Sequence, residues 1–174
     1  MLFILLLLAV TFTRDDLPEG WNKVSLPTAG FKVNMPNPER KFMEDKGPDD
    51  KPVFIRMHRG KEGKVSYLVT VSEFSLSYIS QPAKTIFDNA REGSLARSGG
   101  SLVSEKDIKL DKVPGREFVV KAKEAGFVRA RVYVFNQRQY SVMVAGPKLE
   151  DLETPETKQF FDSFKLTPIR KQGK

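Results

Sequence analysis

The stretch from residue 102 to residue 146 constrains the fold more than any other part of the sequence. It holds four short runs rich in β-branched and alternating apolar residues, at 102–110, 116–123, 127–135 and 140–146. Turn-forming sequences separate the last three runs from their neighbours, at Pro114-Gly115, Glu124-Ala-Gly126 and Asn136-Gln-Arg138. Strands that follow one another so closely are typical of an antiparallel meander.

The rest of the chain adds further strands and two helices. Residues 21–25 and 31–35 alternate and predict a hairpin, and 53–59 and 65–75 predict two strands. The second of these is apolar enough to be covered on both faces, and 44–52 is expected to be a polar loop. Helices are predicted over 82–98, which Gly99-Gly100 ends, and from Thr154 onward. We therefore expect an α+β fold, an antiparallel β-sheet of about six to eight strands packed by two main helices, as a single domain over 14–168.

The first 13 residues are almost entirely apolar. This run is shorter than the ~20 residues that span a bilayer, and it matches the apolar region of a secretory signal. We expect 1–13 to be a signal peptide or a short N-terminal anchor, and the protein to be periplasmic, envelope-associated or secreted. A buried first strand or helix is the alternative. Residues 169–174 are expected to form a basic C-terminal tail.

The composition excludes several kinds of chemistry. The chain has no Cys and a single His, His58. Disulfides, thiolate nucleophiles, Cys-containing zinc sites and two-His metal sites are therefore excluded, and we expect no cofactor. A hydrolase would have to use His58 with distant carboxylates, because no Gly-x-Ser-x-Gly motif supplies a nucleophile.

Two segments resemble a known family. The first is Trp21…Pro27-x-x-Gly30-Phe31-x-Val33-x-Met35-Pro36, and the second is Arg131-x-Tyr-x-Phe-x-x-x-x-Tyr140-x-Val-x-Val144…Phe160-Phe161-x-Ser163-Phe164. Both resemble PsbP-like domains, and the resemblance covers most of 21–167. It implies an α/β/α sandwich around an antiparallel sheet. It also implies binding or assisting roles, since members include a photosystem accessory protein, a Ran-binding import factor and many exported bacterial proteins. None of the functional residues of those members maps onto this chain.

The net charge of +7 is unevenly distributed. Residues 116–138 hold six basic and two acidic residues, and the last ten residues hold four basic and no acidic ones. A turn centred near Ala125 would place Lys121 opposite Arg129, and the period of two would put four cations on one sheet face. These candidate anion-binding or partner-binding residues are Lys121, Lys123, Arg129 and Arg131. The alternative is a solvated face supported by Glu residues from a covering helix.

These observations favour an exported, non-enzymatic binding or accessory domain of the bacterial envelope. Its partner would be an unknown protein, an acidic polymer or an anionic surface, recognised through the basic sheet face, and we expect no specific nucleic acid and no transmembrane span in the mature chain. Two alternatives remain: a hydrolase using His58, and a structural module that docks onto a larger complex.

Overall fold

The computed structural model describes residues 17–47, 49–124 and 126–169. Ten strands are present in this part of the chain. They are β1 Trp21–Leu26, β2 Phe31–Pro36, β3 Glu39–Lys46, β4 Pro52–Glu62, β5 Val65–Glu73, β6 Ser101–Leu110, β7 Val113–Ala122, β8 Gly126–Phe135, β9 Arg138–Gly146 and β10 Lys165–Leu166. The helices are α1 Leu76–Ile79, α2 Ala83–Ser98, the 3₁₀ helix η1 Leu149–Leu152 and α3 Pro155–Ser163. The predicted α+β class is confirmed, and α2 and α3 are the two predicted main helices.

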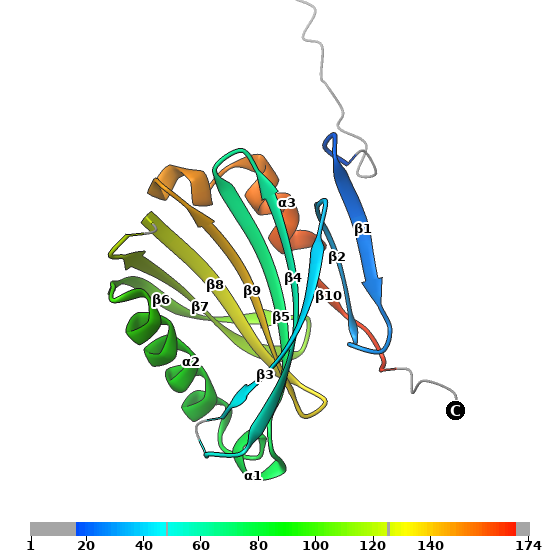
Figure 1. Ribbon diagram of the computed structural model, residues 1–174, viewed down its shortest axis with the longest axis vertical. Helices are drawn as coiled ribbons and strands as arrows, with labels where there is room; N and C mark the ends of the chain where they lie inside the picture. The colour runs from blue at the N-terminus through cyan, green and yellow to red at the C-terminus, as the bar shows by residue number, and fades with distance from the viewer. Residues whose placement is uncertain (1–16, 48, 125, 170–174) are drawn as a thin grey trace, which may run out of the picture.

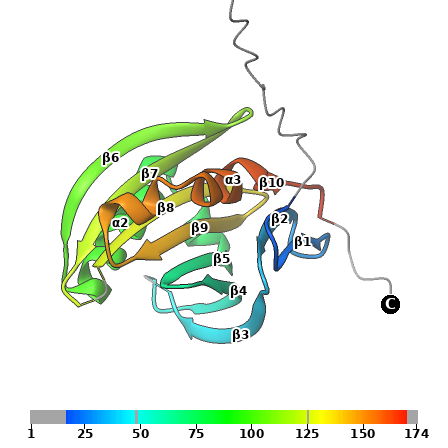
Figure 2. The same cartoon turned by 90° about the horizontal axis from the view of Figure 1, so that it is seen from above.

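Seven strands form one antiparallel sheet in the order β3-β4-β5-β9-β8-β7-β6 (Figure 1). Strands β6 to β9 are the predicted meander, but its first turn is at Asp111-Lys112, and Pro114 and Gly115, the predicted turn residues, lie within β7. Pairing of β5 with β9 joins this meander to the β3-β4-β5 meander. Seen from above, the strands between the two edges form a curved wall (Figure 2). Seven strands lie within the number expected from the sequence.

The predicted N-terminal hairpin forms, but it belongs to a second sheet. Strands β1 and β2 pair with each other, and the short β10 pairs with β2. The Tyr140 hydroxyl donates to the Ala29 carbonyl at 3.0 Å, which ties the hairpin to the large sheet. Gly60 allows the close approach, because a Cβ there would lie 2.0 Å from the Pro36 carbonyl oxygen.

The prediction of a polar loop over 44–52 is partly wrong. Residues 44–46 belong to β3, which pairs with β4 along its whole length without a register shift. Six of its eight residues are charged and every one is exposed, so neither apolar alternation nor strand propensity marks it in the sequence. The segment is therefore a strand because of its pairing with β4, and its own sequence does not indicate one.

Each face of the large sheet carries one main helix. Helix α2 packs on β7 and β8 through Phe87, against Phe118, Val120 and Val132. Its C-terminus is capped by Gly99 in the left-handed conformation at φ 56°. On the other face, α3 and the small sheet cover β5, β9 and β8. Thr154 caps α3 by accepting from the Thr157 amide, and the helix buries Phe160 and Phe161.

The expected leader at 1–13 lies outside the described residues, as do residues 170–174 of the expected tail. The predicted domain limits of 14–168 therefore stay a prediction. None of the helices in the described ranges combines the length and the apolar character needed to cross a bilayer.

Candidate functional site

The register of β7 and β8 differs from the one expected for the predicted basic residues. Ala122 pairs with Gly126, so the turn is centred one residue earlier than expected, near Glu124. Lys121 consequently lies opposite Phe127, and Arg129 lies opposite Val119. Lys121, Arg129 and Arg131 still share one face of the sheet, because the register moves by an even number of residues. Lys123 lies in the turn beyond the end of β7.

Arg131 is engaged within the protein. Its Nε donates to the Glu117 carboxylate at 2.6 Å, and its guanidinium lies 4.4 Å from the centre of the Phe161 ring. Glu117 is buried, and it also pairs with Lys106 at 3.0 Å. Burial opposes ionisation of Glu117, but hydrogen bonds and charges from Arg131 and Lys106 outweigh it, so the pKa of this carboxyl lies below its ordinary value.

The positive charge of Arg129 is also compensated within the protein. It forms an ion pair with Glu153, from the segment between η1 and α3, and η1 itself packs against β8 and β9. Both arginines therefore contact the η1–α3 region. Glu153 provides a carboxylate for Arg129, and α3 provides the Phe161 ring for Arg131. Among the described residues, only Lys121 and Lys123 of the four candidates are exposed and without an ion pair.

His58 lies in the core, on the sheet face that carries the small sheet. Its side chain is buried, its ring meets Phe31 edge-on at 5.7 Å, and no described residue forms a hydrogen bond with its Nδ1. Burial, followed by the charge of Arg40, lowers its pKa. Within the described ranges no hydroxyl or carboxylate bonds to this imidazole, so the geometry that the hydrolase alternative requires is not found there. The same part of the chain holds no cluster of three or more acidic or His side chains suited to a metal ion.

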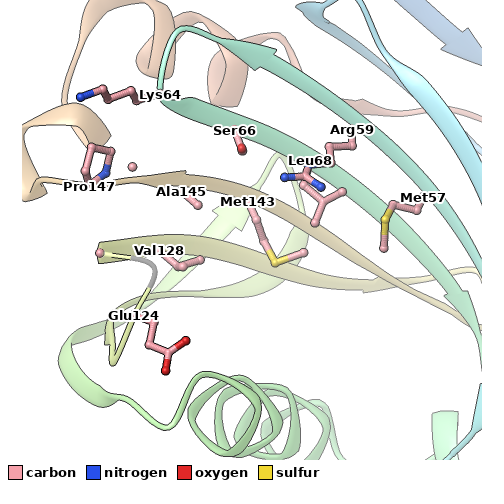
Figure 3. A pocket seen from close by; sticks show the side chains of 12 residues that line it. Met57, Arg59, Lys64, Ser66, Leu68, Glu124, Val128, Met143, Ala145 and Pro147 are labelled. Atoms are coloured by element: carbon pink, nitrogen blue, oxygen red, sulfur yellow. The ribbon is translucent and has the colours of Figure 1, made fainter.

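An open groove lies on the α2 side of the sheet. Helix α2 covers β7 and β8 but leaves much of β4, β5 and β9 uncovered. The resulting groove has a volume of about 760 Å³ (Figure 3). Residues of β4, β5, β8 and β9, residues of two turns, and Pro147 after the end of β9 line it.

The floor of the groove is apolar. It consists of Met57, Leu68, Val128 and Met143, which are all half-buried. Leu68 and Met143 are cross-strand partners in β5 and β9. Their neighbours Tyr67, Val69, Val142 and Val144 point to the opposite face and fill the core. The expectation that β5 is covered on both faces is therefore wrong at this end of the strand.

Charged side chains flank the floor. Arg59 comes from β4 and Lys64 from the turn before β5, and Glu124 comes from the turn between β7 and β8. Figure 3 shows the two cations on one side of Met143 and Glu124 on the other, toward α2. Lys61 lies on the same sheet face, since it pairs with Ser66. In the described structure Arg59, Lys61 and Lys64 are exposed and form no ion pair.

Sequence reasoning missed this groove. Ser66, Leu68, Thr70 and Ser72 alternate with the core residues of β5, and such a half-polar second face was the signal for an incompletely covered strand. Which strands α2 covers depends on long-range packing, which no local pattern reveals.

Comparison with known proteins supports the fold. No protein-family model matches the chain, and no curated protein does. The solution structure of cyanobacterial PsbP (CyanoP) from Synechocystis sp. PCC 6803 is similar with a TM-score of 0.54. It shares 13% sequence identity, and the match covers 84% of this chain and 92% of that one. The chain therefore has a PsbP-like fold, as its two sequence segments indicated.

Proposed function

We propose that the protein is an exported, non-catalytic accessory domain of the bacterial envelope that binds an anionic amphiphile in the open groove. Such a ligand has an aliphatic part and an acid group. The observation that carries the proposal is the juxtaposition of a half-buried apolar floor with exposed cations that form no ion pair among the described residues. A PsbP-like fold is compatible with a binding role but does not specify a ligand.

The size and lining of the groove suit a small molecule. Its volume of about 760 Å³ lies within the roughly 300–1,000 Å³ typical of ligand sites. Met57 and Met143 contribute long, unbranched side chains that adapt to an aliphatic chain. Burial of such a chain over Leu68 and Met143 would remove apolar surface from water on both partners.

The charges orient the ligand. Arg59 and Lys64 would attract an acid group to the β4–β5 side of the groove, whereas Glu124 on the opposite side would repel it. We therefore expect the acid group beside the two cations and the aliphatic part across Leu68 toward Val128. A ligand with a cationic head would lose this attraction.

Calorimetric titration of the full chain with dodecanoate and with dodecyltrimethylammonium tests the proposal. We expect dodecanoate to bind and the cationic amphiphile of equal chain length to bind at least about tenfold more weakly, since each exposed ion pair is worth up to about 1 kcal/mol. Arg59→Ala with Lys64→Ala should weaken dodecanoate binding by a similar factor. The matched control is Lys23→Ala with Lys32→Ala on the small sheet, which should not change it.

Equal binding of the two amphiphiles, or an equal loss in the two double variants, would contradict the proposal. Binding of an extended acidic peptide in place of dodecanoate would also contradict it, and would indicate a protein partner.

The predicted basic face remains a second, narrower proposal. Lys121 and Lys123 are its two exposed members without an ion pair in the described structure. If they bind an acidic polymer, Lys121→Glu with Lys123→Glu should abolish retention on an acidic polysaccharide column, and Lys23→Glu with Lys32→Glu should not. Equal retention of both variants would exclude this face as a binding site.

Export rests on residues 1–13 alone. Mass spectrometry of the native protein should find a mature N-terminus within residues 10–14. An intact Met1 on protein from the cytosolic fraction would contradict export.

A further inference from the structure

We infer that the edge strand β3 pairs with β3 of a second copy, so that the protein forms a two-fold symmetric dimer through a continuous antiparallel sheet. No residue of β3 is among those that line the groove, and the inference does not depend on the groove ligand. It rests on the exposure, regularity and charge pattern of Glu39–Lys46.

The outer edge of β3 has no partner strand in the part of the chain that the structure describes. There β3 pairs with β4 alone, and all eight of its residues are exposed. Phe42 is 72% exposed, and Phe54, beside it on the same face of β4, is 53% exposed. An unpaired edge with exposed aromatic side chains is a template for another strand.

The opposite edge of the sheet is less suited to pairing. Strand β6 has a register shift between Leu102 and Ser104, and such bulges interrupt edge pairing. Its Glu105 and Asp107 are already engaged by Arg91 and Arg116. Strand β3 has no register shift, and within the described residues only its last residue, Lys46, is in an ion pair, with Asp50 at 2.9 Å.

Charge favours a second copy as the occupant. The chain carries a net charge of +7, so two copies repel each other in general. Strand β3, however, has three acidic and three basic residues, and it presents a neutral edge. Two copies can therefore approach here with less repulsion than a uniformly basic surface would give.

Symmetry limits the register. A two-fold axis normal to the sheet leaves each side chain on its own face of the sheet. Residues that lie directly opposite each other in the two copies point to the same face, so their numbers must be both even or both odd. An axis through Phe42 places the two Phe42 rings together and sets Arg40 opposite Glu44 of the second copy on both sides. An axis through Met43 would instead set Arg40 opposite Lys46. The charge pairs on this face of the sheet therefore favour the axis through Phe42.

On the opposite face of the sheet this register gives a less favourable arrangement of charges, but nearby cations offset the repulsion. Glu39 and Asp45 of the second copy lie opposite each other at the strand ends. Lys41 is a diagonal neighbour of that Asp45, and Arg59 of the same chain lies opposite Glu39 on β4. Because the axis is normal to the sheet, the two grooves of the dimer would open on the same side.

Charge exchange at one pair tests the inference in the full chain. Sedimentation equilibrium should show a concentration-dependent dimer. Arg40→Glu alone should raise the dimer dissociation constant by at least about tenfold, because two symmetry-related pairs become repulsive. Glu44→Arg alone should do the same, and Arg40→Glu with Glu44→Arg should restore dimerisation. Glu19→Arg, an exposed charge reversal outside β3, is the matched control.

A chain that stays monomeric at all concentrations would overturn the inference. So would a dimer that persists unchanged in both single variants, since its contact would lie elsewhere. Circular dichroism and the unfolding midpoint of each variant establish that it remains folded, which the exposure of both side chains leads us to expect.

Discussion

Three individual side chains explain why two of the four predicted basic residues, Arg129 and Arg131, are compensated within the protein. Arg131 is held by Glu117 and Phe161, and Arg129 by Glu153. The sequence showed the charges and their shared strand face, but not the cover that neutralises them. Glu153 is 24 positions from Arg129, and only the packing of η1 against β8 brings it there.

Glu117 provides a test at this scale. Because its pKa is lowered in the folded state, it binds protons less readily there than in the unfolded chain, so it stabilises the fold above the ordinary value of 4.5. This stability should be lost as the pH falls through the lowered pKa. Glu117→Gln should cost about 1–2 kcal/mol in urea unfolding at neutral pH, and the difference from the parent should shrink below pH 4.5. A pH-independent difference would contradict the ion-pair account.

His58 should also lose stability as the pH falls, but in a higher pH range than Glu117. Burial lowers its pKa below the ordinary 6.5, so the unfolded chain binds a proton that the folded chain resists. Stability from this group is present above pH 6.5 and is lost as the pH falls from 6.5 toward the lowered value. His58→Phe should flatten this part of the curve of unfolding free energy against pH. An unchanged slope in the variant would show that His58 is not the titrating group.

At the scale of elements, the sequence predicted most of the sheet and both main helices. The meander and α2 were identifiable because their alternation, periodicity and turn residues are local signals. Strand β3 was missed because six of its eight residues are charged. The groove was missed for a related reason: it exists where α2 does not cover β4, β5 and β9, and that placement is a long-range property.

One buried cation connects α2 to the sheet. Arg116 on β7 pairs with Asp88 of α2 at 3.0 Å and with Glu105 of β6 at 2.7 Å, and it lies over the Phe87 ring. Arg116→Met should destabilise the fold by about 2–3 kcal/mol, since it leaves partly buried carboxylates without their partner.

Hydrogen exchange is the discriminating measurement for that variant. Loss of protection should be largest in α2 if Arg116 anchors the helix to the sheet. Lys84→Met, which removes an exposed ion pair to the same Asp88, should change stability by no more than about 0.5 kcal/mol. Uniform loss of protection in Arg116→Met would contradict a local anchoring role.

At the scale of the whole molecule, the two faces of the large sheet differ in how completely they are covered. One face is closed by α3 and by the small sheet, which bury a contiguous core that includes Phe160, Phe164 and Tyr140. Among the described residues, the other is closed by α2 over β7 and β8 and by α1, whose Tyr78 and Ile79 pack near Val134 of β8. The uncovered part combines an apolar floor with cations that form no ion pair among the described residues, and this asymmetry is the basis of the proposed binding role.

Methyl NMR of the full chain labelled at its methionines tests that role most directly. Met57 and Met143 lie in the groove, whereas Met35 is fully buried in the opposite core. Addition of dodecanoate should shift the Met57 and Met143 methyl resonances in a saturable manner and leave Met35 unchanged, and Arg59→Ala with Lys64→Ala should weaken the response. Shifts at Met35 alone, uniform shifts, or no saturable shift at Met57 and Met143 would contradict the assignment of the groove as the binding site.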